Sequence, residues 1–420
     1  MPVFVLGILV FSYLVFPTFQ SVWGSSANVL MGTMVVQGLA WVYLLQHKEH
    51  LPLKGLLLGG VLAFLAARSV PPIFEDDYFR YFWDANQTLN NLRPYAASPA
   101  TAPAFGLEEL REKISFSELV TFYPPVAQFL FAVFFFVSGG WLPLFLFLFS
   151  LVGSVLALWC IARLASQSGL LWVALLSLHP LIVKEWYQSV HYDMWLVAAI
   201  ALTLRSVKLK GLWLGISVNL KWVTLPLLAT LPPKEGIRIS WGIVLGVCCG
   251  ILIPWAFFFR DLPMVWESLS TFGTTWEMNS GVFRWLRGLF YWLDWSPVWG
   301  PRVCVGILWV GFDLWYFSRE SDSRRRAFWM LWSMVVISPV VNTWYLTWSL
   351  PLLYFLPSQQ RLWMAFGFAW FPLSYAFYGY EPGQGLEVFW NLEHGIILAA
   401  AIAGLRSLRG WGAKKNAVKG

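Results

Sequence analysis

The chain has 420 residues, of which 58% are hydrophobic and 12% are charged, and its net charge is +7. Soluble domains carry about a quarter charged residues, so this composition excludes a water-soluble globular protein and indicates a chain embedded in lipid. Lys and Arg gather in short loops and near the C-terminus, as the positive-inside rule predicts, which argues against nucleic acid as a partner.

Apolar runs of roughly 20 residues recur along the sequence, and each is long enough to cross about 30 Å of hydrocarbon. Backbone groups in lipid must bond within the protein, and runs such as 141–160 carry no charge, so they predict helices and not barrel strands. The expected fold class is an all-α polytopic membrane protein with about 11–13 transmembrane helices. In chain order, the spans are expected near residues 3–20, 28–46, 53–70, 141–162, 170–184, 192–205, 240–259, 301–318, 327–340, 345–357, 362–378 and 391–405.

Two apolar stretches do not fit a simple count of spans. A full span at residues 124–138 would put Arg163 on the wrong side of the membrane, and residues 211–232 lie between two basic loops, which predicts a hairpin or a re-entrant pair. Irregular backbone survives at membrane depth only beside protein or a water-filled cavity. Both stretches therefore hint at an internal cavity.

The long segments on the outer side of this arrangement belong to one membrane domain, residues 1–420. They are residues 71–123, 260–300 and 379–391, and a basic cytoplasmic tail covers 406–420. The first segment is the richest in polar groups, and the mixed amphipathic character of residues 107–119 predicts short helices along the outer membrane surface.

Three consecutive acids, Glu75, Asp76 and Asp77, follow the third expected span directly. Acids at a membrane exit are costly near lipid. If this segment is helical, Asp76 or Asp77 shares a face with Arg80, and Arg80 in turn faces Asp84 four residues later. The pattern fits a solvated helix end held by ion pairs. It also fits an acid/base site, in which a carboxylate must stay ionised and reach an acceptor hydroxyl.

Several motifs extend this acidic segment. In the first outer segment they are Asp76-Asp77-x-x-Arg80-Tyr81-x-Trp83-Asp84, Arg93-Pro94-Tyr95 and Tyr123-Pro124-Pro125. Later ones are His179-Pro180 before His191-Tyr192-Asp193, Phe272 and Trp276 before Asn279-Ser280, and Ser338-Pro339 before Trp344-Tyr345 and Trp348. In this order and spacing they resemble the GT-C glycosyltransferases, membrane enzymes that use polyprenyl-phosphate-linked sugars, and in particular the bacterial mannosyltransferase-like members.

The resemblance covers most of the chain, with three departures. Ala85 stands where Gly commonly follows the Trp-Asp pair, Arg93 where Asn often precedes Pro-Tyr, and Asn342-Thr343 where His-Pro often precedes Trp-Tyr. These departures concern the sugar and the acceptor more than the class of reaction.

The resemblance implies a GT-C-like bundle whose first large outer loop carries a carboxylate general base. The base deprotonates an acceptor hydroxyl, which attacks the anomeric carbon of the sugar as polyprenyl phosphate departs. The family pattern favours the first acid of the pair, so Asp76 is the expected base and Asp77 the alternative. Arg80 is expected to orient the carboxylate or to neutralise phosphate. The other expected binding residues of these motifs are Trp83, Asp84 and Tyr123.

A second polar stretch, residues 184–193, joins two apolar spans on the same side as the acids. Lys184 is expected to hold phosphate, and His191 or Asp193 to bond the sugar or the acceptor. An ordinary interfacial loop with an aromatic belt is the alternative. His191 and Asp193 could join Asp76 around a divalent cation, but no tight ligand spacing demands one, so no cofactor is expected.

Further along the chain, Asn279 is expected to bind substrate, and Arg284 or Arg287 is a candidate phosphate clamp, because arginine pairs phosphate in a bidentate manner. The alternative for the two arginines is an interfacial helix that meets lipid headgroups. Lys221, inside an apolar stretch, is expected to extend to the membrane interface.

These patterns together predict a glycosyltransferase. It would move a hexose, with mannose suggested by the resemblance, from a polyprenyl-phosphate donor to a lipid or glycan acceptor on the outer face of a bacterial plasma membrane. The sequence lacks a Gly-rich phosphate loop, G-x-S-x-G and H-E-x-x-H, which argues against ATP-driven transport, serine hydrolysis and zinc proteolysis.

The alternative is a secondary transporter or lipid flippase, which intramembrane charge and the irregular residues 211–232 would suit. Against it, polar residues concentrate at one membrane face and no inverted repeat is visible.

Overall fold

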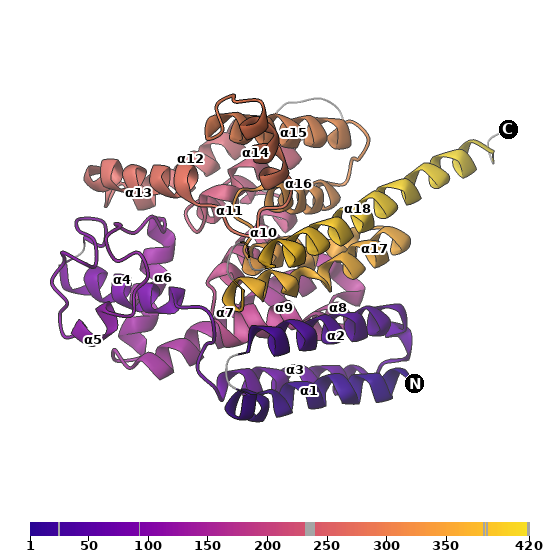
Figure 1. Ribbon diagram of the computed structural model, residues 1–420, viewed down its shortest axis with the longest axis horizontal. Coiled ribbons are helices and arrows are strands. Elements are labelled where there is room, and N and C mark those ends of the chain that lie inside the picture. The colour runs from indigo at the N-terminus through magenta and orange to yellow at the C-terminus, as the bar shows by residue number, and fades with distance from the viewer. Residues whose placement is uncertain (24–25, 92, 232–239, 381–382, 384, 418–420) are drawn as a thin grey trace. The chain divides into compact units, whose positions relative to one another are not determined.

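The computed structural model describes residues 1–23, 26–91, 93–231, 240–380, 383 and 385–417 (Figure 1). Within these residues the regular elements are helices, and one isolated parallel bridge joins Met278 and Val340. The predicted all-α fold class is therefore confirmed. The chain divides into two compact units. Unit 1 is Met1–Val70, Ala165–Lys184 and Glu277–Gly420, and unit 2 is Pro71–Leu164 and Glu185–Trp276.

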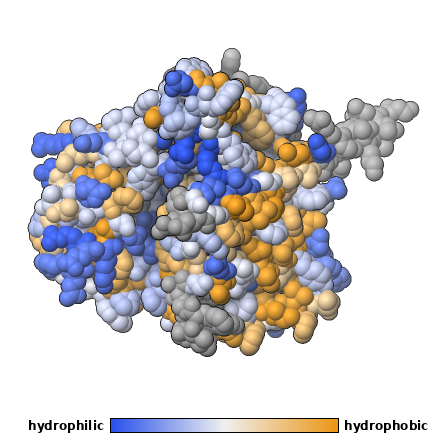
Figure 2. Space-filling model, in the orientation of Figure 1, coloured by the Kyte–Doolittle hydropathy of each residue, from blue (hydrophilic) through white to orange (hydrophobic). Residues whose placement is uncertain are grey.

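Unit 1 contains the N-terminal and C-terminal helices. Its elements are α1 (Pro2–Trp23), α2 (Ala27–Gln46), α3 (Leu53–Arg68), α8 (Gly169–Leu176), α9 (Pro180–Ile182), α14 (Val282–Trp292), α15 (Trp299–Phe317), α16 (Ser323–Ile337), η6 (Thr343–Trp348), η7 (Leu350–Phe355), α17 (Ser358–Phe368), η8 (Phe371–Tyr378) and α18 (Leu386–Ala417). The α1 helix packs on α2 and α3, α2 packs on α17 and η8, and α17 packs on α18. In Figure 2 the surface over α2 is mostly hydrophobic, as expected of a helix that meets lipid.

Unit 2 contains the first outer segment and the middle of the chain. Its elements are α4 (Asp77–Asn91), α5 (Glu108–Arg111), α6 (Pro125–Val137), α7 (Leu142–Ala165), the π-helix η3 (Val183–Gln188), α10 (Asp193–Arg205), α11 (Lys210–Val218), η4 (Trp222–Thr230), α12 (Trp241–Trp255), η5 (Phe259–Asp261) and α13 (Leu262–Thr275). The first residues of η3 and the last of α7 lie across the unit boundary. Over α5 the visible surface is largely hydrophilic (Figure 2).

Helical structure occupies each of the expected spans, but proline interrupts three of them. The expected span 170–184 bends by 66° between Gly169–Leu176 and Pro180–Gln188. The span 345–357 is two 3₁₀ segments, η6 and η7, and the span 362–378 is α17 followed by η8. Proline lacks the amide hydrogen that an α-helix needs, and it stands at each of these breaks.

Among the described residues, three helices are by themselves long and apolar enough to cross a membrane: α2, α7 and Leu386–Arg406 of α18. The described residues give five if each bent pair, Gly169–Leu176 with Pro180–Gln188 and Trp241–Trp255 with Phe259–Thr275, is one span. The wider count of about 11–13 spans stays a prediction. The helix α6 has 13 residues, which at 1.5 Å per residue reaches only about 20 Å, so it is too short to span hydrocarbon alone.

Glycines bring α11 and α12 into close contact. A Cβ atom on Gly215 would lie 2.6 Å from the carbonyl oxygen of Val247 and 2.7 Å from Cα of Gly250. A Cβ atom on Gly211, one turn earlier, would overlap the carbonyl oxygen of Ile243. Small residues four apart let two helices approach this closely in a membrane protein. The contact fixes α11, and therefore the position of Lys221 just beyond its end.

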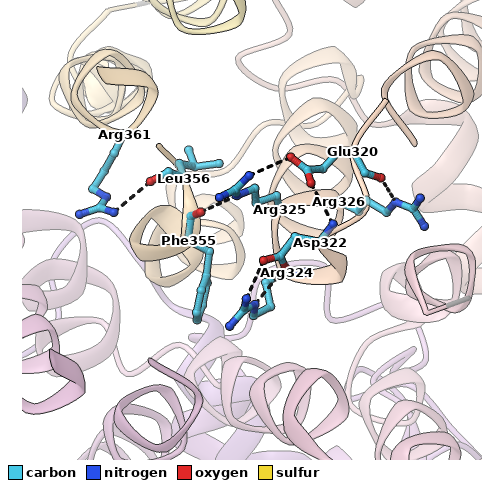
Figure 3. Close-up of polar contacts among 8 residues, drawn as sticks. All are labelled: Glu320, Asp322, Arg324, Arg325, Arg326, Phe355, Leu356 and Arg361. Carbon is cyan, nitrogen blue, oxygen red and sulfur yellow. Dashed lines mark hydrogen bonds and ion pairs between the residues drawn. The ribbon is translucent and has the colours of Figure 1, made fainter. Parts of the chain in front are cut away.

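A group of charged side chains in unit 1, called here the arginine cluster, joins the start of α16 to η7 and α17 (Figure 3). Its members are Glu320, Asp322, Arg324, Arg325, Arg326 and Arg361. Asp322 caps α16 by accepting from the backbone N of Arg324 at 2.8 Å, and its carboxylate pairs with the Arg324 guanidinium at 2.6 Å. Arg361 donates to the carbonyl oxygens of Leu353, Tyr354 and Leu356 at 2.6–3.1 Å.

Candidate active site

The two acids Asp76 and Asp77 lie at the start of α4 and have different surroundings. Asp77 is the first residue of the helix, where the N-terminal end favours a negative charge. Tyr81, one turn later, donates its hydroxyl to Oδ2 of Asp77 at 3.4 Å. Asp76 precedes the helix and accepts a short hydrogen bond from Ser115. Asp76 therefore bonds a residue of the first outer segment, whereas Asp77 lies toward His191 of the second polar stretch.

Arg80 and Asp84 form the predicted pair four residues apart, with Nε of Arg80 3.0 Å from Oδ1 of Asp84. Arg80 also donates to the carbonyl oxygen of Leu119 at 2.9 Å, and Asp84 accepts from Nε2 of Gln128 at 3.1 Å. The sequence predicted Asp76 or Asp77 on one side of Arg80 and Asp84 on the other, and the described contacts show the pair with Asp84. These bonds fasten α4 to α6 and to the segment that precedes α6. They thereby orient the acids at the start of α4.

Aromatic side chains surround Asp77. The rings of Tyr81, Tyr123 and Tyr192 contact one another, with centroid distances of 5.4, 5.5 and 5.3 Å. Trp83, which was expected to bind substrate, has an exposed fraction of 1%. Its burial favours a role in the core of the protein.

His191 lies between two carboxylates. Its Nδ1 atom is 3.7 Å from Oδ2 of Asp77, and its Nε2 atom is 3.4 Å from Oε2 of Glu185. Within unit 2, the structure therefore brings Glu185 and His191 of the second polar stretch close to Asp77. Gln188 donates to the carbonyl oxygen of Pro71 at 2.9 Å, which ties the second polar stretch to the start of the first outer segment.

Lys221 lies at the junction of α11 and η4 and pairs with Asp193. Its ammonium is 2.8 Å from Oδ1 of Asp193 and 5.0 Å from the centroid of the Tyr192 ring. The structure thus gives Lys221 a carboxylate partner, and its extension to the membrane interface stays a prediction. The five ionisable residues of this region, called here the Asp77 cluster, are Asp77, Glu185, His191, Asp193 and Lys221.

The electrostatics of the cluster make Asp77 a stronger base than an ordinary aspartate. Desolvation, followed by the charge of Asp76, raises the pKa of Asp77 from 3.8 to about 7, although the charge of Lys221 opposes the rise. Asp193 adds to the rise and the hydrogen bond from Tyr81 reduces it. A base works best when its pKa lies near the operating pH, because it is then ionised and still basic. The side chain of Asp77 is 36% exposed, so an incoming hydroxyl can reach it.

The other expected binding residues belong to unit 1. The ammonium of Lys184 lies 5.2 Å from the centroid of the Tyr375 ring. Asn279, which has a left-handed backbone with φ of 48°, donates to Oε1 of Glu393 at 3.0 Å. Arg284 donates to Oδ1 of Asn391 at 2.7 Å. The last two contacts fasten α14 and the segment before it to α18.

A metal site was an open possibility for His191, Asp193 and Asp76. Within the part of the chain that the structure describes, no group of three or more His, Cys, Asp or Glu side chains is arranged to hold a metal ion. The described contacts instead pair His191 with carboxylates and Asp193 with Lys221. The donor set thus favours ion pairing within the protein.

Two members of the cluster, Glu185 and Lys221, were not predicted as site residues. A signal for them exists in the sequence: Lys221 is an ionisable residue inside an apolar stretch, where a charge is costly without a partner, and Glu185 belongs to the polar stretch 184–193. The sequence could not say which partner each would find, since Glu185 reaches Asp77 only through His191.

A family model matches the part of the chain that carries the Asp77 cluster. The model described as alpha-(1→6)-mannopyranosyltransferase, N-terminal domain, matches residues 9–231, which is more than half of the chain and includes the whole Asp77 cluster. No curated protein and no solved structure matches the chain. The family is one of GT-C membrane enzymes, so the match decides for a transferase over a transporter or flippase. On the strength of this match, the chain belongs to the MptA/B family of alpha-(1→6)-mannopyranosyltransferases.

Proposed function

We propose that the protein transfers mannose from a polyprenyl-phosphate-linked donor to a hydroxyl of a lipid or glycan acceptor at the outer membrane face, with Asp77 as the general base. The observation that carries the proposal is the Asp77 carboxylate, which lies within the matched segment, is reachable by solvent and has a pKa raised to about 7. The sequence pattern favours Asp76 instead, but one oxygen of that carboxylate accepts a hydrogen bond from Ser115, and Asp76 does not contact His191 in the described ion pairs. The geometry therefore supports the second acid of the pair.

The reaction needs little more than such a base. The acceptor oxygen attacks the anomeric carbon of mannose, the bond from that carbon to the phosphate oxygen breaks, and the phosphate departs with the bonding electrons. Asp77 takes the proton of the acceptor hydroxyl as this happens. The name of the family supports the primary 6-hydroxyl of a mannose residue as the acceptor group. Lys221, held by Asp193, supplies positive charge beside the carboxylate.

The test is a transfer assay with the purified full chain in lipid nanodiscs. Polyprenyl-phosphate mannose and polyprenyl-phosphate glucose are offered as donors, each with an α-mannoside acceptor, and products are detected by mass spectrometry and methylation analysis. We expect a mannose product linked through the 6-hydroxyl, dependent on the mannose donor. A lipid acceptor and a soluble oligomannoside acceptor, run in parallel, separate the two acceptor classes. Absence of any mannose transfer from the wild-type chain would refute the proposal.

A further inference from the structure

The ring of His191 connects Asp77 to a third residue, Glu185, in the interior of the protein. Glu185 and His191 are both 0% exposed, whereas Asp77 is 36% exposed. The three groups form a row from the reachable carboxylate, through the imidazole, to a carboxylate in the interior. Such a row can transmit an effect from Glu185 to the base.

The backbone between Glu185 and His191 is bent to make this row. Residues Val183–Gln188 form a π-helix, a form found mostly as single turns at functional sites. Val190 has φ of +61°, which a β-branched residue rarely adopts. The backbone N of His191 then donates to the carbonyl oxygen of Glu185 at 2.9 Å. Backbone strain of this kind persists only where the surrounding structure imposes it, and it clusters at active sites.

Burial decides which nitrogen of His191 carries the proton. A neutral imidazole has one N–H group and one lone pair. Glu185 is buried away from water, so its carboxylate depends on donors from the protein, whereas Asp77 can also accept from water. The N–H group is therefore needed most on Nε2, toward Glu185. The lone pair on Nδ1 then faces Asp77 at 3.7 Å, the longer of the two contacts that the ring makes with carboxylates.

We propose that Glu185 is a positioning residue for the transfer reaction: it accepts the N–H of His191 Nε2, so that the Nδ1 lone pair of His191 faces Asp77 and holds the proton that Asp77 takes from the acceptor. This inference rests on the proposed role of Asp77 as the base. As the new bond to the anomeric carbon forms and phosphate departs, the hydroxyl proton moves to Asp77. The resulting carboxylic acid donates to Nδ1, and Asp77 returns the proton to solvent after the product leaves.

The arrangement helps the reaction because it favours the later state over the earlier one. Before transfer, the Nδ1 lone pair and the Asp77 carboxylate are two acceptors facing each other. During transfer, the same pair becomes a hydrogen bond, and only interactions that strengthen toward the transition state raise the rate. The other titratable groups facing Asp77 are Asp76 and Tyr81 from its own segment, Asp193 from α10 and Lys221, which directly precedes η4. None of these is altered by the substitutions below.

The first measurement is the pH dependence of kcat/KM for wild type, Glu185→Gln, His191→Gln and the double variant. We expect each single variant to lower kcat by about tenfold or more, with KM nearly unchanged. We expect the acidic limb of the profile to move to lower pH, because Asp77 no longer faces an imposed lone pair. Glu185→Gln should change kcat by less than about twofold in the His191→Gln background, since it acts through His191. Additive losses, or an acidic limb that stays in place, would overturn the proposal.

A matched control is Glu393→Gln in unit 1. Glu393 is also 0% exposed, and it accepts a hydrogen bond from Asn279. The control makes the same chemical change at the same degree of burial outside the row. Its acidic limb should coincide with that of the wild type whatever happens to its kcat. A shift in this control equal to that of Glu185→Gln would mean that the limb reports general loss of structure, and would overturn the proposal.

A second measurement does not depend on turnover. Asp77→Asn is introduced into wild type and into Glu185→Gln, and the change in Tm that it causes is measured in each. This change follows the ionisation of Asp77, so the pH dependence of the change reports the pKa of Asp77. The pH above which the difference becomes constant should be lower in Glu185→Gln than in wild type. If no mannose is transferred but this shift occurs, the row stands and the proposed function fails. If mannose is transferred but neither the limb nor this pH moves, the function stands and the row fails.

Discussion

In the arginine cluster of unit 1, cations outnumber carboxylates, and the surplus guanidinium groups donate to backbone carbonyl oxygens. Arg325 bonds the carbonyl oxygen of Phe355 at 2.8 Å, and Arg326 bonds those of Glu320 and Phe317 at 2.6 and 2.9 Å (Figure 3). In the Asp77 cluster of unit 2, the carboxylates Asp77, Glu185 and Asp193 outnumber the one ammonium, Lys221. The first cluster satisfies helix ends, whereas the second leaves a carboxylate with too little compensating charge.

The difference shows in the pKa values of two aspartates. Burial raises the pKa of Asp322, but the hydrogen bonds and charge of Arg324 together lower it by more, so it lies below 3.8. Desolvation and the neighbouring acids raise the pKa of Asp77 to about 7. A carboxylate that stabilises the fold is held ionised, while a carboxylate that serves as a base is held ready to take a proton. The following predictions test this contrast, from the largest expected effect to the smallest.

The largest effect should come from Asp77→Asn. The amide keeps the shape of the side chain but cannot accept the hydroxyl proton, so kcat should fall by about 10²–10⁴-fold, or about 3–5 kcal/mol in the barrier. Asp76→Asn is the neighbouring control and should lose less, because Asp76 bonds Ser115. Steady-state assays of mannose transfer measure both. If Asp76→Asn is inactive and Asp77→Asn is near normal, the base is the first acid, as the family pattern favours.

The next effect concerns the ion pair between Lys221 and Asp193. Lys221→Met leaves the buried carboxylate of Asp193 without its cation, which should destabilise the fold by about 3–5 kcal/mol. Adding Asp193→Asn removes the uncompensated charge and should recover most of this loss. Thermal unfolding followed by the fluorescence of the 28 tryptophans provides the measurement. If Lys221→Met is as stable as wild type, the ion pair between Lys221 and Asp193 does not stabilise the fold, and this prediction is wrong.

The sequence was sufficient for much of the fold. Long apolar runs predicted α2 and α7 to within a few residues, since the cost of unpaired backbone groups in lipid leaves few alternatives to a helix. It was insufficient where proline interrupts an apolar run. The predicted span 345–357 is instead two 3₁₀ segments, Thr343–Trp348 and Leu350–Phe355. Pro351 has no amide hydrogen to donate within an α-helix, and tertiary packing decides which backbone form replaces the helix.

For the site, the sequence predicted the acids at the start of α4 and the polar stretch containing His191, because charges at membrane boundaries need a reason. It did not predict that Glu185 lies across the imidazole from Asp77. That contact depends on a π-turn and on the strained backbone at Val190, which no periodicity in the sequence reveals. Nor did it predict Lys221 as the partner of Asp193, since the close contact of α11 with α12 positions it.

A smaller effect is expected in the arginine cluster from Arg361→Met. Three carbonyl oxygens near the end of η7 lose their donor, which should lower the free energy of unfolding by about 1–3 kcal/mol. Arg319→Met is the matched control, because Arg319 is exposed and bonds one carbonyl oxygen, that of Trp315, so its cost should be within about 0.5 kcal/mol. Thermal unfolding measures both. Transfer by Arg361→Met should stay close to wild type per folded molecule, and a large loss of kcat would show that this cluster is not purely structural.

The smallest and most discriminating effect is a difference in sign between the two aspartates as the pH changes. Because the folded-state pKa of Asp322 lies below 3.8, its carboxylate stabilises the fold above about pH 4, and this contribution is lost as the pH falls through the folded pKa. Asp322→Ala should therefore cost about 1 kcal/mol near pH 7, as for other helix caps, and progressively less below pH 4. Asp322→Asn retains a capping oxygen and should cost less than the Ala variant.

Asp77 should behave in the opposite sense. Its folded-state pKa of about 7 lies above the unfolded value of 3.8, so ionised Asp77 destabilises the fold, fully above about pH 7 and not at all below about pH 4. Asp77→Asn should therefore raise Tm near pH 8, and the gain should shrink as the pH falls toward 4. Tm measured across pH 3–8 for Asp77→Asn and Asp322→Ala should give differences from wild type that are opposite in sign near pH 8. The gain of Asp77→Asn should vanish near pH 4, whereas the loss of Asp322→Ala should begin to shrink only below pH 4. Two curves of the same sign would mean that both carboxylates serve the fold alike, and the contrast between the two clusters would not hold.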